Sequence, residues 1–334
     1  MSPNAIKRDN EVVRSVQSAA SEFVDELDQG QCESDDWSDA EITDTVVTRS
    51  MNRLLQRLSD TRLLGKANQL ASSEVWRIAG HVLKHGDLQN HARTKPRGYA
   101  GDYQMLHKIC RQTICEHPLG RAFDRFFQDQ DAPQAVRNRT QLTADRITAH
   151  VNRLESKRPK IVSIGSGSAE DIIQAIKQTP VKSRKEVDVI LLDLDADALD
   201  FARQQLEPLL PIESVYCLRT NLYRIPRNKK TLNLLQNADF LICAGLFDYL
   251  NQADAADMLA SFWNSLSDTG KLMVFNFAPG NPSRTYMEWI GNWYLLYRSR
   301  DEMLELTEHA SLPKDQFVVG AEELKLNQCV EAWR

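Results

Sequence analysis

Hydrophobic residues recur at helical spacing through the first part of the chain. From Glu11 to Leu27 the apolar positions fall three or four residues apart, which predicts an amphipathic helix. A polar stretch over 28–41 predicts a loop, and Ser38 and Asp39 near its end are suitable N-caps for the next helix. Further helices are predicted over residues 42–58, 73–84, 102–115 and 135–156. Between two of them, Pro96, Gly98 and Gly101 argue against regular helix over residues 91–103.

The pattern changes near residue 155, where short β-branched runs begin to alternate with helical stretches. Such alternation predicts a parallel sheet with helices on both faces. Five strands are predicted over residues 160–165, 187–195, 214–221, 238–245 and 270–278, with helices over 169–178, 196–206 and 253–266. Two β-like pieces, QFVVG and CVEAWR, follow near the end. The sequence therefore predicts a helical domain over 1–155 and an α/β domain over 156–334.

Composition limits the kinds of partner that this chain can bind. Its 334 residues are 42% hydrophobic and carry a net charge of −5, which predicts folded domains and argues against a broad nucleic-acid or anionic-membrane surface. A local basic pocket remains compatible with that charge. The sequence has no apolar run of about 20 residues and no signal-like apolar segment, so a cytoplasmic protein without membrane insertion is expected.

Cysteine and histidine usage gives no metal signature. None of the six cysteines forms a CxxC pair, so they are expected to be reduced thiols. His81 and His85 would share one helix face, with His91 nearby, but no carboxylate at suitable spacing completes a ligand set. No metal is expected.

The turn after the first predicted strand carries the first chemical signal. Gly165 and Gly167 allow positive φ angles and a close approach of ligand to backbone, although a tight turn without a ligand could use them too. The third-glycine position of a dinucleotide motif is occupied by Glu170, and Asp171 follows. Two carboxylates at a helix N-terminus repel a pyrophosphate and suit a ligand with a sulfonium and an ammonium. This pattern disfavours a nicotinamide-dependent oxidoreductase.

Polar groups follow the next strands at the same predicted edge of the sheet. Asp193 ends the second strand, where a carboxylate can accept both hydroxyls of a ribose, while Asp195 can cap the following helix. Asn221 follows the third strand, and Ala244 and Gly245 follow the fourth. Since the carboxyl ends of parallel strands share one edge, these positions are expected to form one ligand site.

The segments SIGSGSAED, LLDLDADAL and ADFLICAGLFDYL, in this order, resemble class I S-adenosylmethionine-dependent methyltransferases. The resemblance implies a Rossmann-like seven-stranded sheet with its last strand antiparallel. It implies S-adenosylmethionine (SAM) as cofactor and S-adenosylhomocysteine as product. An acid is usual at the adenine-side position occupied here by Asn221, whose amide can still bond the adenine. The implied cofactor-binding residues are Gly165, Ser166, Gly167, Glu170, Asp193, Leu194, Asn221, Leu222, Ala244 and Gly245. Apart from the resemblance, Tyr99 on a glycine-flanked loop could contribute to this pocket, and Arg137 or Arg139 could pair with the methionine carboxylate of the cofactor.

The longer segments KPRGYAGDY, AVRNR, CAGLFDYL and NPSRTYMEWIGNWYLLYRSRDEM resemble a bacterial family assigned to the biosynthesis of 3-hydroxypalmitic acid methyl ester. That resemblance implies O-methylation of a carboxyl group on a fatty-acid-like acceptor. Two alternatives stay open: O- or N-methylation of another metabolite, which calls for a general base, and a SAM-binding protein without catalysis. A small-molecule acceptor is expected, without nucleic acid, and a homodimer stays open.

Residues for the acceptor come from two further segments. Tyr99, Asp102 and Tyr103 lie on a glycine-flanked loop and are the candidate catalytic residues, although an interdomain turn would use them as well. After the fifth strand, an arginine and several aromatic residues could meet an acidic, apolar acceptor or could be core at helical spacing. These candidate substrate-binding residues are Arg284, Tyr286, Trp289, Trp293 and Tyr297.

Overall fold

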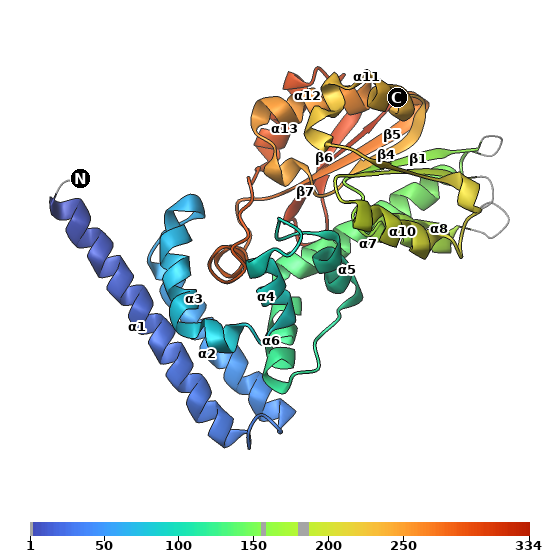
Figure 1. Cartoon of the computed structure of the whole chain (residues 1–334). Helices are drawn as coiled ribbons and strands as arrows, with labels where there is room; N and C mark the ends of the chain where they lie inside the picture. The colour runs from blue at the N-terminus through green and yellow to red at the C-terminus, as the bar shows by residue number, and fades with distance from the viewer. Residues whose placement is uncertain (1–2, 155–157, 180–186) are drawn as a thin grey trace. The chain divides into compact units, whose positions relative to one another are not determined.

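The computed structural model describes residues 3–154, 158–179 and 187–334, with side chains from residue 11 onward. The chain divides into two compact units (Figure 1). Unit 1 comprises residues 1–134 and 282–294, and unit 2 comprises residues 135–281 and 295–334.

Unit 1 is helical, as the sequence predicts. Its helices are α1 (Pro3–Glu33), α2 (Ala40–Asp60), α3 (Gln69–Leu83), α4 (Asp87–Thr94), α5 (Tyr103–Arg111) and α6 (Pro118–Gln128), with a short 3-10 turn, η1 (Gly65–Asn68). In α2 most of the predicted apolar stripe, from Val46 to Leu58, is buried, and Asp39 accepts hydrogen bonds from the backbone N–H groups of Glu41 and Ile42. Asp39 is therefore the N-cap that the sequence predicts.

Several predicted boundaries in unit 1 are wrong. Helix α1 continues to Glu33, so the predicted loop begins six residues later than Asp28. Residues His91–Thr94 are helical because the breakers Pro96 and Gly98 lie beyond them. Helix α5 ends at Arg111 because Gln112 adopts a left-handed φ of 50°. Helix α6, which starts at Pro118, was not predicted.

Unit 2 contains a seven-stranded sheet in the order β3-β2-β1-β4-β5-β7-β6. Its strands are β1 (Lys160–Ile164), β2 (Asp188–Asp193), β3 (Val215–Arg219), β4 (Ala238–Cys243), β5 (Leu266–Phe277), β6 (Phe317–Ala321) and β7 (Asn327–Trp333). Strands β1 to β5 pair in parallel, whereas β7 is antiparallel to both β5 and β6. This is the Rossmann-like class I methyltransferase sheet, and the predicted fold class is confirmed.

Helices cover both faces of this sheet, so its strands are buried on two sides (Figure 1). On one face, Ile161 of β1 and its neighbours pack against α7 (Asp131–Val151), α8 (Glu170–Gln178) and α10 (Ala196–Leu206). On the other face, Val162 and its neighbours pack against α12 (Gln252–Trp263) and α13 (Arg300–His309). Helices α11 (Lys229–Leu235) and α13 were not predicted, and α12 ends three residues before the predicted position.

The two units differ from the predicted division at residue 155. Their boundary falls inside α7, between residues 134 and 135, and the predicted end of this helix at residue 156 lies outside the described residues. The aromatic segment after β5 returns to unit 1, where Ser72 donates a hydrogen bond to the Trp289 carbonyl (2.8 Å) and the Trp76 indole donates to the Ile290 carbonyl (2.9 Å). Residues 286–290 form a π-helical turn, η5. Residues 292–299 have no regular structure, so the helical spacing of the aromatic residues up to Tyr297 does not correspond to a helix there.

Candidate functional site

The glycine turn of unit 2 joins β1 to α8 at the carboxyl edge of the sheet. Its backbone is bonded to the neighbouring strand, because the N–H groups of Gly165 and Ser166 both donate to the Leu192 carbonyl (2.8 and 3.1 Å). Gly165, Gly167 and Ala169 have φ angles of 64°, 51° and 53°. Two of these three left-handed positions are occupied by glycine, the residue that adopts this conformation without strain.

Asp193 ends β2 beside this turn and is almost completely buried. One of its carboxylate oxygens accepts a hydrogen bond from the Gly167 N–H (2.9 Å), and the other accepts from the Asp195 N–H (3.0 Å). Burial raises the pKa of Asp193 above its ordinary value, while these two N–H donors oppose the shift. The carboxylate is thereby held in one orientation at the strand end.

The remaining predicted positions of this edge also lie at strand ends. Asn221 follows β3, and its side-chain oxygen accepts from the Tyr223 N–H (3.1 Å), which leaves its NH₂ group as the outward donor. Leu222 is buried, and a Cβ built on Gly165 would lie 3.4 Å from its Cδ1 atom. Leu194 is 53% exposed. Ala244 and Gly245 follow β4 and are half-buried.

A buried arginine, Arg139, lies at this edge, whereas the other candidate, Arg137, is half-buried. Arg139 is 5% exposed, and its Nη1 donates to Asn327 Oδ1 (3.1 Å). A Cβ built on Gly245 would lie 3.9 Å from its Nη2. The AVRNR segment contains both arginines, and helical periodicity could not show which of the two is buried. The structure shows that Arg139 is the buried one of the two.

Two acids, the half-buried Asp171 and the buried Asp248, interact electrostatically with this arginine. Desolvation raises the pKa of Asp171 to about 6, and the Ile172 N–H and Arg139 oppose that rise. Desolvation likewise raises the pKa of Asp248 to about 6, against the attraction of Arg139. Asp248 was not predicted as a site residue. It lies in the loop after β4 and accepts a hydrogen bond from the Phe277 N–H (2.7 Å).

The charges at this edge do not balance. It carries four carboxylates, Glu170, Asp171, Asp193 and Asp248, and two buried or nearly buried guanidinium groups, Arg139 and Arg298. These carboxylates outnumber the two guanidinium groups, so the edge favours a ligand with positive charge.

Two buried polar atoms at the same edge lack a partner within the described residues. They are Oγ of Ser166, in the glycine turn, and Nδ2 of Asn327, the residue that also bonds Arg139. Buried polar groups are nearly always hydrogen-bonded in native proteins. A ligand or solvent at this edge would satisfy them.

The candidate catalytic residues Tyr99, Asp102 and Tyr103 belong to unit 1. Asp102 is completely buried, and its Oδ1 caps α5 by accepting from the N–H groups of Gln104 and Met105 (3.0 Å each). Its Oδ2 lies 2.7 Å from Nε2 of His91. Both oxygens are thus engaged within unit 1, and the assignment of Asp102 to catalysis stays a prediction.

The two tyrosines of this loop differ in burial. Tyr103 begins α5 and is 8% exposed, with the guanidinium of Arg97 5.2 Å from its ring centroid. Tyr99 lies on the irregular segment before α5 and is half-buried. Their assignment to catalysis stays a prediction.

The predicted acceptor residues are divided between the units. Tyr297 belongs to unit 2, whereas Arg284, Tyr286, Trp289 and Trp293 belong to unit 1. Tyr286 and Trp289 are at most 2% exposed, and Trp293 is 8% exposed. The Tyr286 hydroxyl donates to Gln89 Oε1 (2.7 Å). Packing in the unit 1 core accounts for these three aromatic side chains, and their contact with an acceptor stays a prediction.

Arg284 is paired inside unit 1. Its Nε lies 2.7 Å from Oε1 of Glu288, a side chain that is 1% exposed. The second oxygen of Glu288 accepts from the Gly65 N–H and from Asn68 Nδ2 (2.7 Å each). The buried carboxylate therefore has three donors, one of them Arg284.

The part of the chain that the structure describes contains no cluster of three or more His, Cys, Asp or Glu side chains suited to a metal. His85 stacks on His117 with ring centroids 4.1 Å apart, and His91 bonds Asp102. Within the same ranges, no helix is long and apolar enough to cross a membrane.

Comparison with known proteins gives structural matches alone. No protein-family model and no curated protein matches the chain. A solved structure described as a possible exported protein from Bordetella parapertussis superposes with a TM-score of 0.61 at 16% identity, covering 88% of this chain and 96% of that one. This similarity supports a shared fold.

Weaker superpositions include two methyltransferases. Magnesium protoporphyrin IX methyltransferase from Synechocystis, solved with bound SAM, gives a TM-score of 0.45 at 13% identity, with 74% of this chain and 97% of that chain covered. The carbon methyltransferase CurJ gives 0.48 at 14% identity, with 98% and 93% covered.

Proposed function

We propose that this chain is a SAM-dependent methyltransferase that acts on a small molecule. The observation that carries the proposal is the carboxyl edge of unit 2, where the Gly165–Gly167 turn and Asp193 meet an excess of negative charge. A dinucleotide pyrophosphate would be repelled by Glu170 and Asp171. A ligand with an ammonium and a sulfonium would be attracted.

The adenosine part of SAM suits the strand ends of β2 and β3. Asp193 presents carboxylate lone pairs where a ribose could donate both hydroxyls. Asn221 has its oxygen engaged by the Tyr223 N–H, so its NH₂ group is the donor that would meet an adenine ring nitrogen. Leu194, exposed beside Asp193, offers apolar surface to the base.

The methionine part of SAM suits the charged groups around the glycine turn. Arg139 is the guanidinium that would bind the carboxylate, since paired N–H donors match a carboxylate. Glu170 and Asp171 would face the ammonium. The unpartnered Oγ of Ser166 and Nδ2 of Asn327 are further polar contacts available to the ligand.

For the acceptor we propose a carboxyl group on a fatty-acid-like molecule, giving a methyl ester. SAM supplies a methyl group on a positively charged sulfur. An acceptor carboxylate oxygen forms the new O–CH₃ bond as the C–S bond breaks, so no proton has to be removed. Asp102, the candidate base for a hydroxyl or amine acceptor, has both oxygens engaged within unit 1. This engagement favours an acceptor that needs no base.

The test combines binding with product chemistry. The purified chain is titrated with SAM and with NAD by calorimetry, and methyl-labelled SAM is incubated with a metabolite extract. SAM binding and label that mild base releases from an organic-soluble product are expected. Base-stable label would instead indicate an ether or amine product. SAM binding with no transfer would favour a non-catalytic SAM-binding protein, and NAD binding without SAM binding would overturn the proposal.

A further inference from the structure

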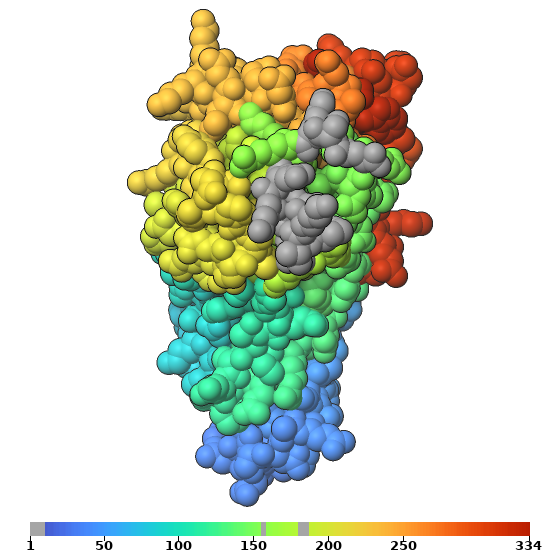
Figure 2. All heavy atoms as spheres, turned by 90° about the vertical axis from the view of Figure 1, so that its right-hand side faces the viewer, coloured from blue at the N-terminus to red at the C-terminus, as the bar shows by residue number. Residues whose placement is uncertain are grey.

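A strongly basic segment follows β3 in unit 2. From residue 219 to residue 230 the chain carries five cationic side chains and no acid, although the whole chain has a net charge of −5. The cationic residues are Arg219, Arg224, Arg227, Lys229 and Lys230, and all five are exposed. Figure 2 shows long side chains protruding from this yellow-to-gold part of the chain.

Four of these cations line one concavity of about 530 Å³. The lining residues are Arg224, Arg227, Asn228, Lys229 and Lys230. They come from the 3-10 turn η3 (Leu222–Arg227) and from the start of α11. Every one of them can donate hydrogen bonds, and no carboxylate lies among them. The volume is in the range of small-molecule sites.

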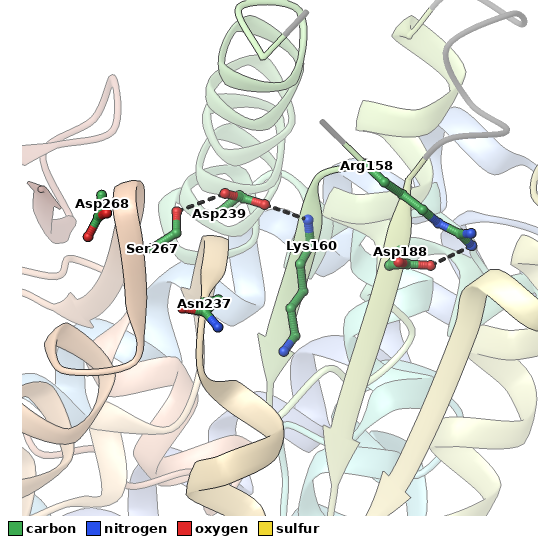
Figure 3. Close-up of a pocket in the computed structure, with 7 residues that line it drawn as sticks. All are labelled: Arg158, Lys160, Asp188, Asn237, Asp239, Ser267 and Asp268. Atoms are coloured by element: carbon green, nitrogen blue, oxygen red, sulfur yellow. Dashed lines mark hydrogen bonds and ion pairs between the residues drawn. The ribbon is translucent and has the colours of Figure 1, made fainter. Parts of the chain in front are cut away.

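No hydrogen bond or ion pair to a described residue engages the four cationic heads. A second cavity of about 500 Å³, at the amino ends of the strands, shows the contrast (Figure 3). There Arg158 pairs with Asp188 (2.7 Å), and the Lys160 ammonium donates to the Gln236 carbonyl (2.7 Å) and is attracted electrostatically by Asp239. In that second cavity neighbouring acids neutralise the positive charge. In the basic pocket after β3 no described acid does so, which leaves the four charged groups accessible to an anionic ligand.

Asn228 gives this basic pocket a fixed donor. Its Oδ1 accepts from the Thr231 N–H (3.2 Å) and so caps α11. With the oxygen held by the helix, the NH₂ group of the same amide is the part left to meet a ligand. An amide donor set among four cations is suited to phosphate oxygens.

We propose that Arg224, Arg227, Asn228, Lys229 and Lys230 form a binding pocket for a small oligophosphate, a ligand with two or more linked phosphate groups. Four cations match the three to four negative charges of such a ligand, whereas a single carboxylate would leave most of them unbalanced. The pocket begins three residues after Asn221, but it shares no residue with the proposed cofactor edge. It therefore stands independently of the proposed function.

The test uses sodium tripolyphosphate as the probe, titrated into the full chain by calorimetry at 50 and 150 mM NaCl. We expect one site per chain, weakened at the higher salt because the cations are exposed. In the variant R224Q/R227Q/K229Q/K230Q the Kd should rise at least tenfold. A control variant, R14Q/R49Q/R62Q/K66Q, loses four exposed cations from unit 1 and should change the Kd less than twofold.

A single substitution tests the amide. Asn228→Asp keeps an oxygen that can cap α11 but replaces the donor with a negative charge, so the Kd should rise at least tenfold while thermal stability is kept. Asn228→Ser also keeps the cap and should weaken binding less. An equal rise of the Kd in the two four-residue variants would overturn the proposal. Unchanged tripolyphosphate binding in Asn228→Asp would also overturn it.

Two further measurements distinguish a free oligophosphate from a nucleotide and from a membrane surface. Equal Kd values for ATP and tripolyphosphate would support recognition of the phosphates alone, and tighter ATP would support a nucleotide. Binding to phosphatidylglycerol vesicles without binding to tripolyphosphate would overturn the proposal in favour of a membrane surface. SAM affinity is measured in the same variants and should stay constant. This measurement distinguishes a failure of the oligophosphate proposal from a failure of the cofactor proposal.

Discussion

The carboxylate of Asp193 accepts a hydrogen bond from the backbone N–H of Gly167, 2.9 Å away. This bond joins the end of β2 to the turn after β1, so that a side chain 26 residues further along the chain fixes the glycine backbone. The turn and the carboxylate thus form one rigid unit at the carboxyl edge of the sheet. Binding of SAM should depend on both.

Gly167→Val is expected to abolish SAM binding, with the Kd raised at least tenfold. Gly167 has φ 51°, so a branched side chain there is strained and should distort the turn whose N–H bonds Asp193. The control is Gly65→Val, because Gly65 has φ 60° and open space around an added Cβ. Calorimetry should show normal SAM affinity in the control. Retained affinity in Gly167→Val would mean that the cofactor site is misplaced.

Arg139→Lys should weaken SAM binding about tenfold or more, because a lysine keeps the charge but loses the paired donors of the guanidinium. With decarboxylated SAM the same substitution should have little effect. Arg137→Lys is the control, since Arg137 is half-buried and should change neither affinity. A larger effect of Arg137→Lys would assign the carboxylate to that residue instead.

Asp248 should make the folded chain less stable as the pH rises. Its pKa is raised from 3.8 to about 6 by burial, so between pH 4 and 6 the unfolded chain loses this proton while the folded chain keeps it. Below pH 4 the protonated Asp248 imposes no penalty on the folded chain. As the pH rises to 6, the free energy of unfolding falls by about 3 kcal/mol. In denaturant unfolding at pH 4 to 7, Asp248→Asn should remove this contribution and leave the parallel one of Asp171, whose pKa is also raised to about 6. The exposed Asp268→Asn should leave it intact.

Asp102→Asn is expected to act on stability rather than on turnover. The substitution weakens the α5 cap and the contact with His91, which should cost about 1–3 kcal/mol of unfolding free energy. Turnover per folded molecule and SAM affinity should change less than twofold. A loss of turnover above a hundredfold at unchanged stability would restore Asp102 as a general base and favour a hydroxyl or amine acceptor.

Arg284 and Glu288 should be strongly coupled in a double-mutant cycle. Arg284→Gln leaves a buried carboxylate without its cation, which should lower the unfolding free energy by about 3 kcal/mol. Adding Glu288→Gln should cost little more. The exposed pair Arg203 and Glu207 is the control, with coupling below about 0.5 kcal/mol. If Arg284→Gln raised the KM for an acid acceptor without any loss of stability, the acceptor role would be supported.

Much of the sheet domain could be predicted because its signals are local. A buried parallel strand is a short apolar run, and KIVSIG and ADFLICAG are such runs. Helix α11 has seven residues and a cluster of lysines at its start, so its periodicity is too short to detect. Helix α4 was missed because the nearby breakers Pro96 and Gly98 outweighed a single turn of helix over His91–Thr94.

The sequence by itself determined the fold class, the glycine turn and the carboxylate at the end of β2, because each depends on residues close together in the chain. Only the tertiary structure decided that Arg139 rather than Arg137 is buried, since one residue along a helix turns a side chain by about 100°. Likewise, only the packing of Trp289 and Glu288 against η1 and α3 placed the aromatic segment in the helical unit. Those contacts join residues more than 200 positions apart, and no local pattern encodes such a pairing.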